Sequence, residues 1–225
     1  MSARFRTETG ITLLGGGEVA PAALVRALAL APVLMAVDSG ADVALAAGLM
    51  PERVVGDFDS ISAEARAAVG EARLMHLPDQ DDTDFDKALR VAEAPFLLAL
   101  GFTGARLDHT LAGMSTLLRN PDARVVLDAG VDLCFLAPPA LHLPLAPGTR
   151  LSLYPMRPVA CESAGLVWPT TGLHLDPGGR IGTSNLVAEG PVELRPAAPS
   201  LLVMAPVAAL EAVIAALAAA PRWRG

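Results

Sequence analysis

Short apolar runs alternate with helix-like segments through the first half of the chain. Buried parallel strands are typically continuous apolar runs, whereas amphipathic helices place apolar residues at i, i+3, i+4 and i+7. Phe85, Ala88 and Leu89 follow the helical spacing, and Thr83 with Asp86 three residues later forms an N-terminal cap pattern. The pattern predicts strands at Ile11–Leu14, Val33–Val37, Arg53–Val55, Ala72–Leu77 and Phe96–Leu100, and helices at Pro21–Leu30, Ala41–Ala47, Ser62–Val69 and Asp84–Ala94.

The pattern changes after about residue 124, where short apolar runs are separated by Pro and Gly turns. Such spacing is typical of an all-β region. The predicted strands there are Val125–Leu127, Leu133–Leu136, Arg150–Tyr154, Gly165–Trp168, Val192–Arg195 and Leu201–Met204, followed by an Ala-rich helix from Val207. We therefore expect an α/β chain of two domains joined near residue 130, the first with a mostly parallel sheet covered on both faces.

The composition and charge of the chain limit the classes of function that it could have. The chain has 225 residues, 52% of them hydrophobic, and a formal net charge of −7, so we expect a sizeable core and no binding to nucleic acid. Cys134 and Cys161 fit core thiols of a reducing cytosol better than a zinc site. The N-terminus shows no signal-type apolar region, and Pro206 and Glu211 interrupt the apolar stretch 201–220, so neither export nor a membrane span is expected.

Seven of the fourteen aspartates lie between residues 57 and 86, in two groups at 57–59 and 79–86. Because dense carboxylates repel one another, and because Mg²⁺ prefers oxygen ligands and often shares them with phosphates, the groups predict a magnesium and polyphosphate site. Asp57, Asp59 and Asp84 are the predicted catalytic metal ligands. Asp82 and Asp86 are interpreted as surface or cap residues. A solvated Gly-Asp turn is the alternative for Asp57 and Asp59.

Four acidic or glycine-rich segments each follow a predicted strand end: Asp38, Asp57, the 79–86 group and the loop 101–109. The carboxyl ends of parallel strands share one edge of a sheet, where ligands bind, so the segments should converge. In the loop, Gly104 would let the backbone approach a phosphate and Arg106 would neutralise it, although a plain turn is the alternative. Gly15–Gly17 is a weaker nucleotide signal, and the sequence has no P-loop, since its single lysine is Lys87.

The motifs together resemble the thiamine pyrophosphokinase (thiamine diphosphokinase) family. The resemblance rests on five segments in register: Asp38–Asp42, Gly56–Ser60, Pro78–Asp84, Arg106–His109 and Thr183–Asn185. It implies transfer of a diphosphate from ATP to the hydroxyl of thiamine, with release of AMP and with Mg²⁺ as cofactor. It also implies a Rossmann-like three-layer catalytic domain (1–130), a β-sandwich domain for thiamine binding and dimerisation (131–225), and a cytoplasmic homodimer.

The resemblance assigns residues to the two substrates. Asp57, Asp59 and Asp84 would hold magnesium and the triphosphate, while Asp38, Gly104, Arg106 and Asp108 would line the ATP site. Gln80, Ser184, Asn185 and Trp168 would contact thiamine, the last three from the β domain, although sandwich core is the alternative for Trp168. Asp42 and Ala105 depart from the family pattern.

Two other functions stay open at this point. A diphosphokinase for another alcohol, such as a pterin, would keep the acidic rim and differ in the acceptor pocket. A sensor would bind nucleotide or thiamine without turnover. In the catalytic reading, the thiamine hydroxyl attacks the β-phosphorus in line, and a carboxylate such as Asp84 or Asp59 serves as an optional base.

Overall fold

The computed structural model describes residues 4–79, 81–104 and 106–223. The described residues form two compact units: unit 1 contains those up to residue 116 together with 127–130, and unit 2 contains 117–126 together with those from residue 131 onward. The mixed α/β class predicted from the sequence is confirmed. None of the helices formed by the described residues is long and apolar enough to cross a membrane.

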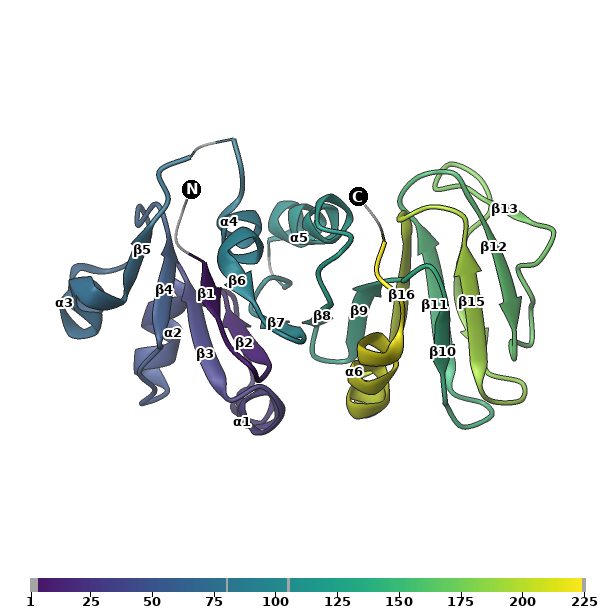
Figure 1. Cartoon of the computed structure of the whole chain (residues 1–225), viewed down its shortest axis with the longest axis horizontal. Coiled ribbons are helices and arrows are strands. Elements are labelled where there is room, and N and C mark those ends of the chain that lie inside the picture. The colour runs from purple at the N-terminus through teal and green to yellow at the C-terminus, as the bar shows by residue number, and fades with distance from the viewer. Residues whose placement is uncertain (1–3, 80, 105, 224–225) are drawn as a thin grey trace. The chain divides into compact units, whose positions relative to one another are not determined.

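Unit 1 is built on a parallel sheet in the order β7-β2-β3-β4-β5, whose strands stand side by side in Figure 1. The strands are β2 (Ile11–Leu14), β3 (Val33–Val37), β4 (Arg53–Gly56), β5 (Leu74–His76) and β7 (Leu97–Leu100). The helices are α1 (Pro21–Leu30), α2 (Gly40–Ala46), α3 (Ala63–Val69), α4 (Asp84–Val91) and α5 (Leu107–Arg119), whose last turn falls in unit 2. The 3₁₀ helix η1 (Glu71–Arg73) precedes β5.

The order of these strands creates a switch point between β2 and β7. From β2 the chain adds β3, β4 and β5 on one side and then returns to add β7 on the other. In open parallel sheets, ligands bind at such a point, beside the carboxyl ends of the strands. Strands β2, β3, β4 and β7 are nearly fully buried, which explains their continuous apolar sequences.

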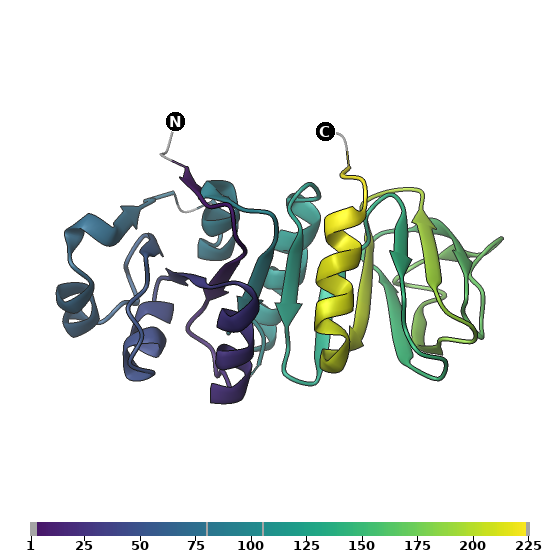
Figure 2. The same cartoon turned by 60° about the horizontal axis from the view of Figure 1, so that its bottom comes forward.

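Unit 2 contains two antiparallel sheets, ordered β14-β11-β16-β9 and β10-β15-β12-β13. Its strands are β9 (Asp132–Leu136), β10 (Leu141–Leu143), β11 (Arg150–Pro155), β12 (Val159–Ala164), β13 (His174–Leu175), β14 (Gly182–Leu186), β15 (Val192–Pro196) and β16 (Leu201–Pro206). The 3₁₀ helix η2 (Val207–Ala209) leads into α6 (Leu210–Ala219). Figure 2 shows α6, in yellow, lying lengthwise beside the strands of unit 2.

Several predicted elements need correction. The strand at 165–168 does not form: Leu166 makes only an isolated bridge to Val187, and Gly165 has a φ of 76°. The helix predicted to reach Ala94 ends at Val91, because Ala92–Glu93 (β6) pairs with Phe5–Arg6 (β1). The predicted strand from Ala72 begins only at Leu74, after η1.

The remaining strand, β8 (Val125–Asp128), is buried and its residues are divided between the two units.

Cys134 and Cys161 are free and buried, as expected of core thiols. Burial raises the pKa of the Cys134 thiol to about 12. The strand predicted to end at Met204 continues to Pro206, and the helix predicted from Val207 begins as η2 and continues as α6 only from Leu210.

Candidate functional site

Two parallel strands end beside each other and place Asp38 and Asp57 together. Asp38 follows β3 and Asp57 follows β4, and the Asp38 amide donates to the Val55 carbonyl oxygen at 2.8 Å. Asp38 adopts a φ of 47°, which turns the chain sharply away from the strand. A Cβ on Gly56 would lie 3.1 Å from Asp38 Cβ and 3.4 Å from Asp84 Oδ1, so the glycine lets these two side chains approach β4 closely.

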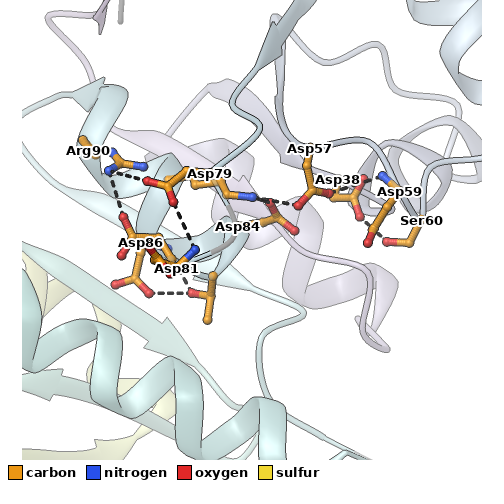
Figure 3. A network of polar contacts seen from close by, with 12 residues as sticks. Asp38, Asp57, Asp59, Ser60, Asp79, Asp81, Asp84, Asp86 and Arg90 are labelled. Atoms are coloured by element: carbon orange, nitrogen blue, oxygen red, sulfur yellow. Dashed lines mark hydrogen bonds and ion pairs between the residues drawn. The ribbon is translucent and has the colours of Figure 1, made fainter. Parts of the chain in front are cut away.

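Asp38, Asp57 and Asp59 form a group able to hold a metal ion, because each offers a carboxylate oxygen and these oxygens lie within 4.8 Å of one another. Asp84 lies beside them, and we call these four residues the carboxylate cluster (Figure 3). Asp38 is only 5% exposed. The Ser60 hydroxyl donates to Asp38 Oδ2, whereas Asp38 Oδ1 is buried and accepts no hydrogen bond from any described residue.

The electrostatics of the carboxylate cluster suit the binding of a cation. Burial raises the pKa of Asp38, the hydrogen bond from Ser60 opposes this, and the negative charges of Asp84, Asp59 and Asp57 raise it further. A buried carboxylate oxygen without a hydrogen-bond donor is costly in a folded protein. A divalent cation among these oxygens would relieve both the burial and the repulsion, so the donor set suits a hard metal ion.

Lys87 is the site residue that the sequence reasoning left unassigned. Its side chain is 1% exposed, and its Nζ donates to Asp57 Oδ2 at 2.8 Å and to Asp84 Oδ1 at 2.9 Å. Burial alone would lower the Lys87 pKa, but the hydrogen bonds and charges of Asp57 and Asp84 outweigh it and raise the pKa. The signal in the sequence was a single lysine among seven aspartates, three positions after Asp84.

The other aspartates of the second sequence group have a structural role. We call Asp79, Asp81, Asp82 and Asp86 the paired acidic segment; Figure 3 shows Asp79, Asp81 and Asp86 on the same side of Asp84 as Arg90. Arg90 Nη1 lies 2.8 Å from Asp82 Oδ2 and 3.7 Å from Asp79 Oδ2. The Asp81 amide donates to Asp79 Oδ1 at 3.0 Å.

Asp86 is a capping residue, as interpreted from the sequence, and it is buried rather than exposed. Thr83 caps α4 by accepting from the Asp86 amide at 3.2 Å, and its hydroxyl donates to Asp86 Oδ2 at 2.6 Å. The Thr116 hydroxyl donates to the same oxygen at 3.0 Å. The predicted cap is therefore confirmed, and α5 contributes to it.

The loop before α5 and the first turn of that helix bring Arg106 and Asp108 together at the surface. Arg106 Nη2 lies 2.7 Å from Asp108 Oδ2, and both side chains are about two-thirds exposed, at 68% and 67%. The hydrogen bond from Arg106 lowers the pKa of Asp108. The Gly104 amide donates to the Thr110 hydroxyl at 3.2 Å, so α5 restrains this loop. Ala105 lies outside the described residues.

Glycines let the loops after β2 and β7 approach each other at the switch point. The Gly17 amide donates to the Gly101 carbonyl oxygen at 3.0 Å, and a Cβ on Gly15 or Gly17 would lie 2.7 Å from that oxygen. The Gly15–Gly17 segment therefore has a packing role in this structure. The segment lies at the edge of the sheet that also carries Asp38 and Asp57.

In unit 2 the structure brings the three predicted thiamine contacts together. The Asn185 side chain is buried, accepts from the Trp168 amide at 3.2 Å and donates to the Trp168 carbonyl oxygen at 2.7 Å. Trp168 is 58% exposed, so the sandwich-core alternative is wrong for this side chain. Ser184 occupies an irregularity in the pairing of β14 with β11, at a φ of 58°, and its amide donates to Ser152 Oγ at 3.0 Å. Gln80, the fourth predicted contact, lies outside the described residues.

Comparison with known proteins gives consistent similarities. Residues 24–127 match the family described as thiamin pyrophosphokinase, catalytic domain. The chain is 31% identical over 163 residues to thiamin pyrophosphokinase 1 of Caenorhabditis elegans, covering 64% of this chain and 66% of the relative. It is 30% identical over 158 residues to thiamine pyrophosphokinase 1 of Arabidopsis thaliana, covering 62% and 59%. The chain thus spans about three-fifths to two-thirds of the length of these relatives.

Solved structures share the fold. The thiamin pyrophosphokinase from Candida albicans superposes with a TM-score of 0.72 at 16% identity, covering 88% of each chain. The yeast thiamin pyrophosphokinase gives a TM-score of 0.73 at 16% identity, covering 94% of this chain and 90% of the other. At such identities the likeness concerns the arrangement of helices and strands.

Proposed function

The chain belongs to the thiamin pyrophosphokinase family, and from this premise we propose that it transfers the diphosphate of ATP to the hydroxyl of thiamine, giving thiamine diphosphate and AMP. The observation that carries the proposal is the carboxylate cluster at the strand ends, with a buried Asp38 oxygen that accepts no hydrogen bond from the described residues. Such a cluster suits a nucleotide triphosphate bound with its cation.

In this proposal each of the two predicted domains has a separate task. A Rossmann-like catalytic domain, residues 1–130, binds the nucleotide beside the switch point of its parallel sheet. A β-sandwich domain, residues 131–225, supplies thiamine contacts and the dimer interface. The switch point between β2 and β7 supports the first assignment, and the exposed Trp168 supports the second.

Asp57, Asp59 and Asp84 would hold Mg²⁺, with Asp38 lining the same site. When bound, Mg²⁺ would neutralise phosphate oxygens and the charge that develops on the leaving AMP. Asp59 is exposed, and the side chain of Asp84 is 27% exposed, so both carboxylates can be reached by a substrate. Asp38 and Lys87 lie deeper and act on the arrangement of the others.

The chain's own residues would position the reaction. Gly104 and Arg106 lie on an exposed loop before α5 and Asp108 lies in the first turn of α5, so the guanidinium of Arg106 meets the phosphates and Asp108 fixes its orientation. The thiamine hydroxyl attacks the β-phosphorus in line, and AMP leaves. Asp59 or Asp84 accepts the hydroxyl proton, a minor contribution because a loose transition state asks little of a base.

Thiamine would be held by Trp168, Ser184 and Asn185 of one subunit and by Gln80 of the other, in a cytoplasmic homodimer. The exposed indole offers an aromatic wall, and Asn185 acts by fixing the backbone that presents it. Replacing Trp168 by Ala should raise the KM for thiamine about 10-fold or more and leave the KM for ATP unchanged. An unchanged KM for thiamine would remove Trp168 from the site.

A product assay tests the proposed activity. The protein is incubated with ATP, Mg²⁺ and thiamine, and the nucleotides are separated, with a parallel sample that lacks thiamine. Thiamine-dependent AMP is the expected product. ADP would indicate single phosphoryl transfer, and intact ATP would indicate binding without turnover. Pterin alcohols in place of thiamine test the acceptor, since preference for one of them would overturn the thiamine assignment.

A further inference from the structure

Lys87 is a buried cation inside a site that otherwise consists of acidic side chains. It is the single lysine of the chain, and its side chain is 1% exposed. Lys87 belongs to the second turn of α4, three residues after Asp84, whereas Asp57 follows the distant strand β4. Through one ammonium group, therefore, α4 is tied to the end of β4.

The two contacts of the ammonium group are short and come from different segments. Nζ lies 2.8 Å from Asp57 Oδ2 and 2.9 Å from Asp84 Oδ1. Charge-assisted hydrogen bonds of this length fix the positions of both carboxylates. Figure 3 shows the two acceptor side chains, Asp57 and Asp84, next to each other.

The burial of Lys87 indicates that its ammonium group does not contact a substrate directly. A side chain at 1% exposure with two carboxylates on its Nζ has little room to meet a phosphate. A phosphate-binding lysine would be expected to point its ammonium toward the ligand. The geometry instead directs the charge of Lys87 at residues assigned to the metal.

We propose that Lys87 is a positioning residue, whose ammonium group holds the carboxylates of Asp57 and Asp84 in the arrangement that a divalent cation meets. The proposal rests on the metal site of the proposed function. It explains how four carboxylates stay together in a folded chain before any metal arrives: the internal cation offsets part of their mutual repulsion.

Removing the ammonium group has a distinctive consequence. Loss of one partner from a buried ion pair leaves uncompensated charge and strongly destabilises a protein. In Lys87→Met the carboxylates would still be able to share a divalent cation, which binds the folded state and restores stability by mass action. The stability of the variant should therefore depend on metal far more than that of the wild-type protein.

Thermal unfolding with EDTA and with saturating Mg²⁺, without nucleotide or thiamine, measures this dependence. We expect the Tm of Lys87→Met in EDTA to fall by about 10 °C, and Mg²⁺ to recover at least about half of the loss. Arg90→Met is the matched control, because Arg90 is the cation of the paired acidic segment. Its Mg²⁺-induced shift should equal that of the wild-type protein. An equal Mg²⁺ shift in Lys87→Met and wild type would overturn the proposal.

A second variant covers the case in which Lys87→Met does not fold in EDTA. The double variant Lys87→Met/Asp84→Asn removes one negative charge together with the positive one, so its Tm in EDTA should lie within about 3 °C of the wild-type value. A double variant as unstable as the single one would show that Lys87 acts through the packing of its aliphatic chain, which contradicts the proposal.

The unfolding experiments test the role of Lys87, and the AMP assay tests the proposed activity, so either proposal can fail without the other. Absence of AMP formation with an enhanced Mg²⁺ response in Lys87→Met would refute the activity and retain the role of Lys87. Normal AMP formation by the wild type, with no enhanced Mg²⁺ response in the variant, would refute the role of Lys87 alone.

Discussion

The carboxylate cluster and the paired acidic segment are similar in sequence but differ in how their charges are satisfied. In the paired acidic segment, Arg90 binds Asp79 and Asp82, and the hydroxyls of Thr83 and Thr116 bind Asp86. In the carboxylate cluster, Lys87 binds Asp57 and Asp84, while a buried oxygen of Asp38 accepts no hydrogen bond from the described chain.

The difference shows that density of aspartates does not by itself locate a metal site. Aspartates at the start of a helix are stabilised by its dipole, its caps and nearby arginines. Aspartates at the ends of parallel strands, by contrast, are brought together from distant parts of the chain. The feature that singles out the carboxylate cluster for a cation is therefore the buried Asp38 Oδ1, which accepts no hydrogen bond from the described residues.

The largest effect should follow from Asp57→Asn. The change removes a charged oxygen ligand from the cluster and one of the two partners of Lys87. We expect thiamine-dependent AMP formation to fall about 100-fold or more. Turnover near the wild-type rate at saturating Mg²⁺ would show that Asp57 does not bind the metal. The carboxylate cluster would then no longer differ in function from the paired acidic segment.

The second effect concerns stability in the paired acidic segment. Asp86→Ala removes the acceptor of two hydroxyls at a buried position beside the cap of α4. The free energy of unfolding should fall by about 1–3 kcal/mol, while turnover changes less than about 3-fold. Urea unfolding and the AMP assay measure the two quantities. A large loss of turnover in protein that remains folded would place Asp86 in the active site instead.

A smaller effect of opposite sign is expected for Asp38→Asn. A neutral amide at this position is no longer repelled by the neighbouring carboxylates, and its oxygen can still accept from Ser60. In EDTA at pH 7 the variant should therefore be more stable than the wild type by about 1 kcal/mol.

The difference in stability between Asp38→Asn and the wild type should depend on pH. Burial, followed by nearby carboxylates, raises the pKa of Asp38 in the folded chain, so a proton binds the folded state more tightly than the unfolded one. The wild type gains stability from this group as pH falls through the raised pKa, and the advantage of Asp38→Asn should vanish there. An advantage that persists below pH 4 would have another origin.

The smallest effect is expected for Asp82→Asn. This carboxylate pairs with Arg90 at the surface, where both side chains are partly exposed, at 34% and 47%. Such pairs contribute little, so stability should change by less than about 1 kcal/mol and turnover by less than about 2-fold. A strong loss of turnover would mean that the two acidic groups share one function.

Much of unit 1 could be predicted from the sequence, because its buried strands are continuous apolar runs and the helix at Asp84 carries its own cap. The convergence of Asp38 and Asp57 followed from the order of strands and helices. The domain boundaries, the roles of individual site residues and the dimer stay predictions.

The parts of the fold and of the site that could not be predicted from the sequence depend on contacts between distant segments of the chain. The role of Lys87 requires β4 and α4 to meet, which no local pattern encodes. Strand β14 (Gly182–Leu186) was missed because Gly, Ser and Asn are depleted in strands, and its pairing with β11 decides its conformation. Strand β6 was missed because it forms by pairing with β1 across more than eighty residues.

Direct titration with Mn²⁺, followed by electron paramagnetic resonance, tests the central claim that the carboxylate cluster is the cation site. Mn²⁺ shares the preference of Mg²⁺ for oxygen ligands. We expect the same Kd for Mn²⁺ in the wild type and Asp82→Asn, and a Kd at least about 10-fold higher in Asp57→Asn. Equal binding by all three proteins, or weaker binding by Asp82→Asn alone, would contradict the central claim.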